Sequence, residues 1–464
     1  MKYILDDCYS YCGYKKLPFG IYDNLSGETF FFDRDKYSLL LDCDNNTDID
    51  LDNLNEDDLK FIKESINKGF IKEANKGDYI KEHQSYIKYP CVYKKSVHFS
   101  ITGNCNYKCR HCFMSSPHAK YRQLKLEEII HVLDELVRCG IKKVEITGGE
   151  PLVHKYFKKV VEEISKRNLK LTVLYTNGML LNEDIINILK DNNQRPTIQI
   201  SFDGIGYHDW MRGIEGAEKA AIKAIKLCRN NNLVVHISMM AFKDNLDNIL
   251  DTIEYLCELG VSQVKVNRVD NLGEWLAYSN EHGITRKQAW DSYLQLIPDI
   301  LTKKPNIRII LEGLFTYDPI SHKFSASYEK TCTSELENRY LLCASLKDGF
   351  YINCDGDVYP CMSYVGLVSF GNVLEKPLDD ILNDKLFILG NYKARDFFEH
   401  NNKCINCEYK YLCIGGCRAR PIINGSDDLL GIDEDACAYF LEGYKTRKDE
   451  IIKKYQKVGH KKIY

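Results

Sequence analysis

Three cysteines with short spacing are the first residues of this sequence that could do chemistry: Cys105, Cys109 and Cys112. Their CxxxCxxC pattern directly follows a β-branched and apolar run at residues 97–102, so one loop at the end of a strand could turn all three thiols inward. Thiolates suit soft metal centres, and three of them leave one iron of a four-iron cluster without a protein ligand. The alternative is a structural zinc loop, although such loops usually take four ligands arranged as two pairs.

Polar or glycine-rich turns close the strand-like runs that come next. Gly148-Gly149-Glu150 ends the second run, and its two glycines would let the backbone approach a ligand closely. A guanidinium matches a carboxylate with two parallel hydrogen bonds, so an arginine after the fourth run is a candidate carboxylate partner. These turns supply the candidate ligand-binding residues Gly148, Gly149, Glu150, Asn177, Ser201, Asp203 and Arg212.

In this order the motifs resemble the radical S-adenosylmethionine (SAM) superfamily. The resemblance implies that the open iron chelates the amino and carboxylate groups of SAM. One electron then releases a 5'-deoxyadenosyl radical. It also implies that Glu150 and its turn hold the SAM amino group and that His111 stacks against the adenine. Ser201, Asp203 and Arg212 would reach the ribose and carboxylate, although each could equally serve as a helix cap or a surface pair.

Nine further cysteines follow residue 330. Seven of them have spacing that resembles the SPASM domain, which binds two auxiliary 4Fe-4S clusters. The resemblance implies an outer cluster on Cys404, Cys407, Cys413 and Cys437, and an inner one on Cys343, Cys361 and Cys417. Cys332 or Cys354 could complete the inner cluster; if neither does, its open iron could take a substrate thiolate. A zinc ribbon on residues 404–417 would leave three of the seven idle.

Repeated βα units must position the first cysteines. Strands are expected at 97–102, 143–147, 169–176, 197–202, 233–240 and 263–269, and helices at 126–138, 155–166, 182–191, 217–230 and 246–259. Six units predict an α/β fold with a parallel sheet, either a partial (β/α)6 TIM-like barrel or an open doubly wound sheet. In both, chemistry belongs at the carboxyl ends of the strands.

Composition divides the chain into four parts. Residues 1–90 predict a winged-helix-like α+β domain, with strands near 20–22 and 29–32, a helix near 57–66 and a strand at 69–71. Residues 91–310 form the predicted barrel, 311–442 the Cys-rich iron-sulfur domain and 443–464 a basic tail. The first part resembles the element with which peptide-maturing radical SAM enzymes grip a leader peptide; the alternative is a purely structural lobe.

Bulk properties exclude several classes of protein. The formal net charge is −3 with dispersed Lys and Arg, which argues against nucleic-acid binding. We expect no membrane segment and a cytoplasmic location, because no apolar run is long enough to span a bilayer. Because the cytoplasm keeps thiols reduced, the 19 cysteines indicate metal chemistry rather than disulfides.

The whole pattern is most similar to maturases that install thioether bridges in ribosomally made peptides, known as sactipeptide maturases. The resemblance implies an oxidoreductase that uses SAM and three 4Fe-4S clusters, acts on a precursor peptide with a leader, and takes electrons from a flavodoxin- or ferredoxin-type donor. Alternatives are a peptide epimerase, a C-C crosslinking maturase, an anaerobic sulfatase maturase or a non-catalytic scaffold. Anaerobic sulfatase maturases carry Asp directly after the last cysteine of the first SPASM segment. In this chain that cysteine is Cys361 and the next residue is Met362, which weakens the sulfatase alternative.

Overall fold

A single 11-stranded sheet forms the centre of the protein, whose computed structural model describes residues 1–118, 120–343, 348–384 and 392–459. The strands lie in the order β16-β15-β14-β13-β12-β11-β10-β9-β8-β17-β18. Their bounds are β8 Ser96–Ser100, β9 Lys143–Thr147, β10 Lys170–Thr176, β11 Thr197–Ser201, β12 Val235–Ala241, β13 Gln263–Arg268, β14 Arg308–Leu311, β15 Phe315–Tyr317, β16 Phe324–Ser325, β17 Gly349–Ile352 and β18 Val358–Tyr359.

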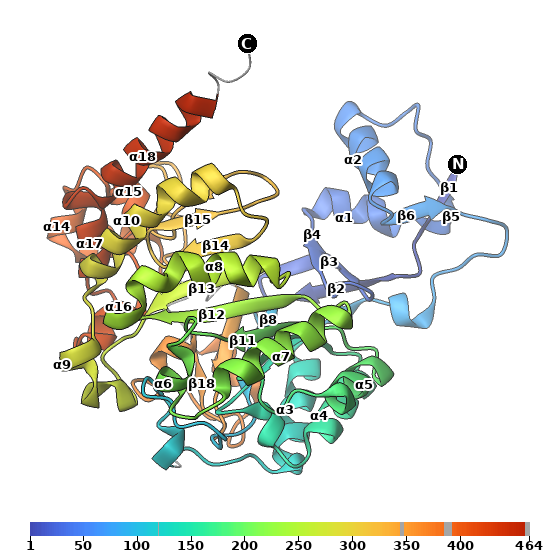
Figure 1. Ribbon diagram of the computed structural model, residues 1–464. Coiled ribbons are helices and arrows are strands. Elements are labelled where there is room, and N and C mark those ends of the chain that lie inside the picture. The colour runs from blue at the N-terminus through green and yellow to red at the C-terminus, as the bar shows by residue number, and fades with distance from the viewer. Residues whose placement is uncertain (119, 344–347, 385–391, 460–464) are drawn as a thin grey trace.

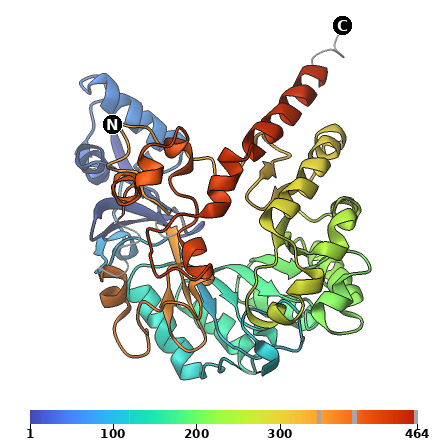
Figure 2. The same ribbon diagram turned by 90° about the vertical axis from the view of Figure 1, so that its left-hand side faces the viewer.

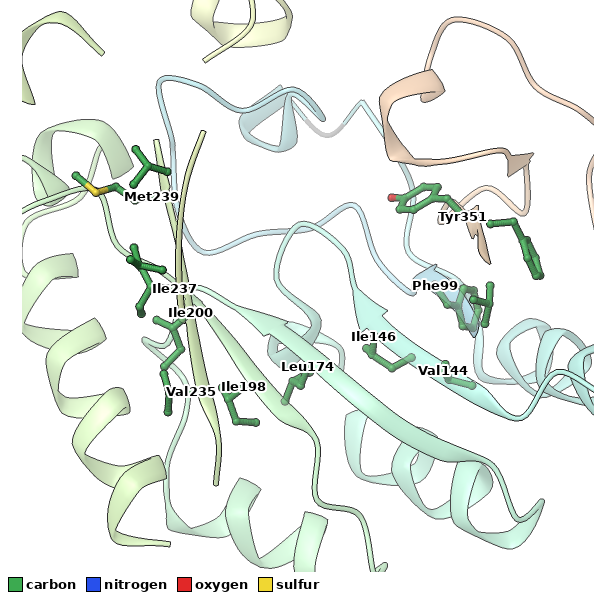
Figure 3. Close-up of a cluster of buried hydrophobic side chains, with 14 of the residues drawn as sticks. Phe99, Val144, Ile146, Leu174, Ile198, Ile200, Val235, Ile237, Met239 and Tyr351 are labelled. Carbon is green, nitrogen blue, oxygen red and sulfur yellow. The ribbon is translucent and has the colours of Figure 1, made fainter. Parts of the chain in front are cut away.

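Helices cover the outer face of this sheet (Figure 1). They are α3 Leu126–Arg138, α4 Phe157–Lys166, α5 Glu183–Asp191, α7 Ala217–Asn230, α8 Ile249–Glu258 and α10 Arg286–Lys303. Alternate strand residues such as Val144, Ile146, Ile198 and Ile237 are buried in the core beneath these helices (Figure 3). The period-two alternation leaves half-buried polar residues such as Glu145 on the opposite face, so the inside of the sheet is not a packed apolar core.

The strand order settles one of the two topologies predicted from sequence. Strands β8 to β14 are parallel neighbours in chain order, whereas the strand order of a doubly wound sheet reverses at a switch point. This order agrees with the partial barrel and not with the doubly wound sheet. All six predicted strands and their helices form within a few residues of the expected bounds. The sheet is larger than predicted, because β17 pairs in parallel with β8 from more than 200 residues downstream.

The N-terminal residues form two small antiparallel-rich sheets with two helices. One sheet has the order β5-β1-β6 and the other β4-β3-β2-β7. In Figure 1 this segment lies to the right of the large sheet, while the helices after residue 400 lie to its left. Its elements are β1 Lys2–Leu5, β2 Tyr9–Tyr14, β3 Leu17–Asp23, β4 Thr29–Phe31, α1 Arg34–Leu41, β5 Asp44–Asp48, α2 Glu56–Asn67, β6 Ile71–Glu73 and β7 Ile87–Lys88.

Short helices replace long elements in the C-terminal part. They are η6 Met362–Tyr364, α12 Leu378–Asn383, α13 Ala394–His400, α14 Asn402–Ile405, α15 Lys410–Cys413, α16 Ala419–Ile423 and α17 Glu434–Leu441. The predicted basic tail forms α18 Tyr444–Gly459, which packs against α10 and projects at the top of Figure 2. The end of that predicted tail, 460–464, lies outside the described residues. No helix among the described residues is long and apolar enough to cross a membrane.

Candidate cluster and cofactor site

The loop that carries the first three cysteines follows β8 and is tied to the short helix α6 His208–Arg212. Lys108 N donates to Arg212 O at 3.2 Å, and Arg110 N donates to Met211 O at 2.9 Å. All three thiols are half-buried, so none is locked in the core.

Each of these thiols has an N–H group directed at its sulfur. Tyr107 N lies 3.4 Å from Cys105 Sγ, Ser116 N lies 3.4 Å from Cys112 Sγ, and Arg212 Nη1 lies 3.8 Å from Cys109 Sγ. Donors of this kind stabilise thiolates, the form that binds metal. Without metal, burial raises the pKa of Cys105 to about 12, a penalty that a bound cation would offset.

The GGE turn fixes the start of the cysteine loop. Gly149 N donates to Thr102 O at 2.7 Å, and Glu150 N donates to Asn104 O at 2.9 Å. A Cβ on Gly148 would stand 2.5 Å from Thr102 O, and one on Gly149 would stand 2.4 Å from Asn104 O. These glycines are therefore required by the close approach of residues 102–104, a reason that the sequence reading did not anticipate.

The Glu150 carboxylate joins this turn to the end of β10. It is fully buried and accepts from Thr176 Oγ1 at 2.9 Å, Asn177 N at 2.7 Å and Leu152 N at 3.1 Å. Burial raises its pKa to about 7 even against these hydrogen bonds. The structure thus brings Glu150 and Asn177 together, and Asn177 Nδ2 in turn reaches Asn106 Oδ1 at 2.7 Å beside the first cysteine.

Asp203 and Arg212 form a buried ion pair beneath the same loop. Arg212 Nε and Nη2 donate to the Asp203 carboxylate at 2.7 and 3.0 Å. Burial alone would raise the pKa of Asp203, but Arg212 and His208 hold it well below its usual value. Asp203 is fully buried, so the structure places it behind Arg212 rather than at the surface of the site, while Ser201 at the end of β11 stays half-buried.

His111 also lies at this end of the sheet. Its Nε2 is buried and has no hydrogen-bond partner among the described residues. Burial lowers the pKa of the ring to about 4, so the imidazole is neutral near pH 7. A neutral ring with an unused nitrogen is compatible with the predicted contact to adenine.

The seven SPASM-type cysteines separate into two groups. Burial is the main cause that raises the pKa of Cys361 to about 11, and the neighbouring thiols of Cys417 and Cys343 contribute to this rise. Burial likewise accounts for most of the rise in the pKa of Cys404 to about 11, and Cys437 and Cys407 contribute to it. We call these the inner group (Cys343, Cys361, Cys417) and the outer group (Cys404, Cys407, Cys413, Cys437).

A cavity of about 380 Å³ opens beside the outer group, whose four cysteines all line it together with Phe398, Tyr409 and Phe440. Across the described ranges, no three His, Cys, Asp or Glu side chains gather tightly enough to hold one metal ion. A four-iron cluster binds each thiolate through a different iron, so a cavity ringed by four separated thiols fits a cluster better than a single zinc ion.

The two candidates for the fourth inner ligand have different surroundings. Cys332 packs in a hydrophobic cluster with Phe397 and Phe398, and Glu337 is the charged group that acts on it. Cys354 is fully buried at the end of β17, beside Ser100 and Asp355.

Two residues that the sequence reading missed do lie at the inner group. The Tyr364 hydroxyl and Arg418 Nε are buried without a hydrogen-bond partner in the part of the chain that the structure describes. Tyr364 is within electrostatic range of all three inner cysteines, and Arg418 directly follows Cys417. Orphaned donors beside thiols fit a sulfur-rich anionic group. The sequence signal that could have pointed to Arg418 is its position directly after Cys417.

Comparison with known proteins agrees with this geometry. Residues 99–267 match the radical SAM superfamily, and residues 343–408 match the SPASM iron-sulfur cluster-binding domain. The chain carries a radical SAM domain followed by a SPASM domain. These domains imply SAM and iron-sulfur clusters as cofactors. The SPASM match ends before Cys413, Cys417 and Cys437, which the tertiary structure adds to the two groups.

Relatives of this radical SAM-SPASM chain differ in their substrates. The antilisterial bacteriocin subtilosin biosynthesis protein AlbA of Bacillus subtilis (strain 168) is 26% identical over 322 residues, covering 69% of this chain and 66% of AlbA, just under two thirds of its length. The AdoMet-dependent heme synthase of Methanosarcina barkeri (strain Fusaro / DSM 804) is 28% identical over 365 residues, covering 74% and 96%.

A solved structure shares the fold over nearly the whole chain. Streptococcus suis SuiB bound to precursor peptide SuiA superposes with a TM-score of 0.65 and 16% identity, covering 94% of this chain and 99% of SuiB. This coverage includes much of the N-terminal segment as well as the two domains.

Proposed function

We propose that this protein modifies a ribosomally synthesised precursor peptide and forms a Cys thioether crosslink in it. The observation that carries the proposal is the extent of the SuiB likeness, because a fold solved with a precursor peptide covers 94% of this chain. AlbA, named for bacteriocin biosynthesis, gives independent support at the level of sequence.

The N-terminal segment, within residues 1–90, is the proposed leader-binding domain. Its two sheets end in the strands β5 and β6 and in β4 and β7, each paired on one side only. A strand with a free edge can take an extended peptide by main-chain hydrogen bonding. Holding the leader there would raise the effective concentration of the core peptide at the barrel.

The proposed cofactors are SAM and three 4Fe-4S clusters. Cys105, Cys109 and Cys112 would hold the first cluster, whose bound form supplies the 5'-deoxyadenosyl radical from SAM. Arg212, ordered by Asp203, would meet the SAM carboxylate, while Glu150, Asn177 and Ser201 would shape the SAM pocket. The inner and outer groups would hold the other two clusters, with a flavodoxin- or ferredoxin-type protein as electron donor.

The balance of atoms explains why auxiliary clusters would be needed. A core residue gives one hydrogen atom to the radical, which leaves as 5'-deoxyadenosine. A substrate thiol gives up one proton as its sulfur bonds to that carbon, and one electron remains. The clusters held by the inner and outer groups would accept this electron and carry it away from the barrel.

The test is incubation of the reconstituted, reduced enzyme with SAM and a small Cys-containing peptide encoded beside its gene. Mass spectrometry should show the loss of two hydrogen atoms per bridge, and thiol alkylation should no longer label the bridged Cys. The Cys109→Ala enzyme is the matched inactive control. A product of unchanged mass would reject crosslinking and favour an epimerase, and a loss of two hydrogens with the thiol still free would favour a C-C crosslink.

Anaerobic sulfatase maturation is less well supported by the site. Such enzymes carry Asp directly after the last cysteine of the first SPASM segment, whereas this chain has Met362, which is 43% exposed. A thioether has no counterpart in that reaction, so the peptide assay above separates the two activities.

A further inference from the structure

Arg418 and Arg420 lie two residues apart and are both buried, yet they differ in their partners. Arg420 reaches three carboxylates: Asp270 at 2.6 Å, Glu312 at 3.7 Å and Asp435 at 3.7 Å. Arg418 makes no ion pair within the described residues. Instead it donates to the carbonyl oxygens of Gly431, at 2.9 Å, and Gly415, and its Nε is unpartnered.

Burying a guanidinium without an ion-pair partner costs free energy. Arg418 is 1% exposed. Moving one charged group out of water costs several kcal/mol unless an opposite charge compensates for it. The Phe397 ring, 4.6 Å from the guanidinium carbon, gives only part of that compensation. Asp433 and Asp428 lie within electrostatic range of Arg418, but neither forms an ion pair with it among the described residues. The Asp433 carboxylate accepts instead from the backbone of Cys417, Asp435 and Ala436.

Arg418 interacts electrostatically with thiols of both auxiliary groups. Cys417 of the inner group and Cys413 of the outer group lie within electrostatic range of the guanidinium. The positive charge of Arg418 also acts on Cys404 of the outer group. The buried cation therefore acts on both sets of sulfur ligands, each of which would be anionic with a cluster bound.

We propose that Arg418 is a positioning residue that serves as the counter-ion shared by the two auxiliary clusters and raises the reduction potential of both. This inference rests on the proposed function, because it needs both clusters to be present. The potential of an iron-sulfur cluster depends on local charge and on hydrogen bonds to sulfur. A fixed positive charge favours the reduced cluster, which carries one more negative charge.

The experiment compares Arg418→Met and Arg418→Lys in the reconstituted holoenzyme by potentiometric titration followed by electron paramagnetic resonance. In Arg418→Met the midpoints of both auxiliary clusters should fall, while the SAM-site cluster keeps its potential. Arg418→Lys retains the charge and should stay nearer to the wild type. The matched control is Arg420→Met. The charge of Arg420 acts on Cys417 of the inner group, so this variant should lower the melting temperature and leave the midpoint of the outer cluster unchanged.

Five outcomes are decisive. Unchanged auxiliary midpoints in a fully iron-loaded Arg418→Met would overturn the inference, as would an equal shift in Arg420→Met. If Arg418→Met fails to retain auxiliary iron, full retention by Arg418→Lys supports the charge role, and equal loss in both overturns it. Wild-type iron sufficient for only one cluster would instead reject the proposed function and the inference with it.

Discussion

The two cysteine-rich regions of this protein are held in place by different means. The loop of residues 105–112 is fixed by the barrel, through the hydrogen bonds of Gly149 and Glu150 at 2.7 and 2.9 Å and through its backbone contacts to α6. The outer group stands on helices of four to eight residues around a cavity of about 380 Å³. From this difference we predict that the first site is preformed by the barrel, whereas the second depends on its bound metal for order.

The largest expected effect comes from Cys109→Ala, which removes a ligand of the preformed site. SAM cleavage should fall below detection, because the first cluster loses one of three ligands, while the auxiliary iron remains. Chromatography of 5'-deoxyadenosine and iron analysis measure the two effects. Cys228→Ala, which removes a fully buried thiol of α7, is the control and should retain cleavage. Normal SAM cleavage by the Cys109→Ala enzyme would reject the assignment of Cys109 as a ligand of the first cluster.

Removal of iron should affect the two regions unequally. Metal binding contributes to folding where ligands converge from short elements, so the chelated protein should lose amide protection across residues 392–443. Strands β8 to β13 should keep theirs, because their hydrogen bonds and apolar core involve no metal. Hydrogen exchange with mass spectrometry reads both. Equal loss of protection in the barrel would show that the first region is not preformed.

Gly149→Ala tests the fixing of the preformed loop. The added Cβ would lie 2.4 Å from Asn104 O and 2.7 Å from Gly103 O, and overpacking of this kind costs about 1–3 kcal/mol. We expect a lower melting temperature and weaker iron binding at the first site. Gly216→Ala is the control, since its Cβ meets nothing within 4 Å and it bears only the strain of φ +82°. Equal iron loss in both variants would point to general destabilisation.

Glu312→Gln tests the charged junction between the barrel and the C-terminal part. Burial alone would raise the Glu312 pKa, but Arg286 lowers it from 4.5 to about 2. The folded state therefore binds fewer protons than the unfolded one, so this stabilisation is present above pH 4.5 and is lost as the pH falls toward 2. Glu312→Gln should melt earlier at pH 7 and show a flatter pH dependence in that window.

Calorimetry of the apo-protein measures this dependence. Glu442→Gln, which removes an exposed pair with Lys287, should keep the wild-type profile. If Glu312→Gln kept that profile as well, the junction would contribute nothing to acid stability.

The smallest expected effect is that of Tyr364→Phe in the apo-protein. Its hydroxyl is buried without a partner among the described residues, so its removal should relieve a desolvation penalty and raise the free energy of unfolding by about 1 kcal/mol. Tyr359→Phe is the matched control in the same segment; it loses a hydrogen bond to Asp357 at 3.4 Å and should cost about 1 kcal/mol. Denaturant unfolding measures both. A costly Tyr364→Phe would mean that the hydroxyl already has a role without a cluster.

The sequence by itself determined the repeated units of the barrel. Strand β9 and helices α3 and α7 begin and end at the predicted residues, because alternation and helical periodicity are local properties that the tertiary fold did not override. The grouping of the seven auxiliary thiols was implied by resemblance to the SPASM domain, and the electrostatic neighbours of Cys361 and Cys404 agree with it. The N-terminal strands β1, β2 and β5 were missed, because short runs with mixed polarity carry little periodic signal.

Only the tertiary structure decided the contacts between distant segments. It placed β17 beside β8, paired Asp203 with Arg212, and buried Cys332 among aromatic side chains. Within the described residues, it also gave Arg420 three carboxylates but Arg418 no ion pair. The physical reason is that burial and electrostatic partners depend on which residues meet in space. Spacing along the chain fixes such meetings only within one element or loop.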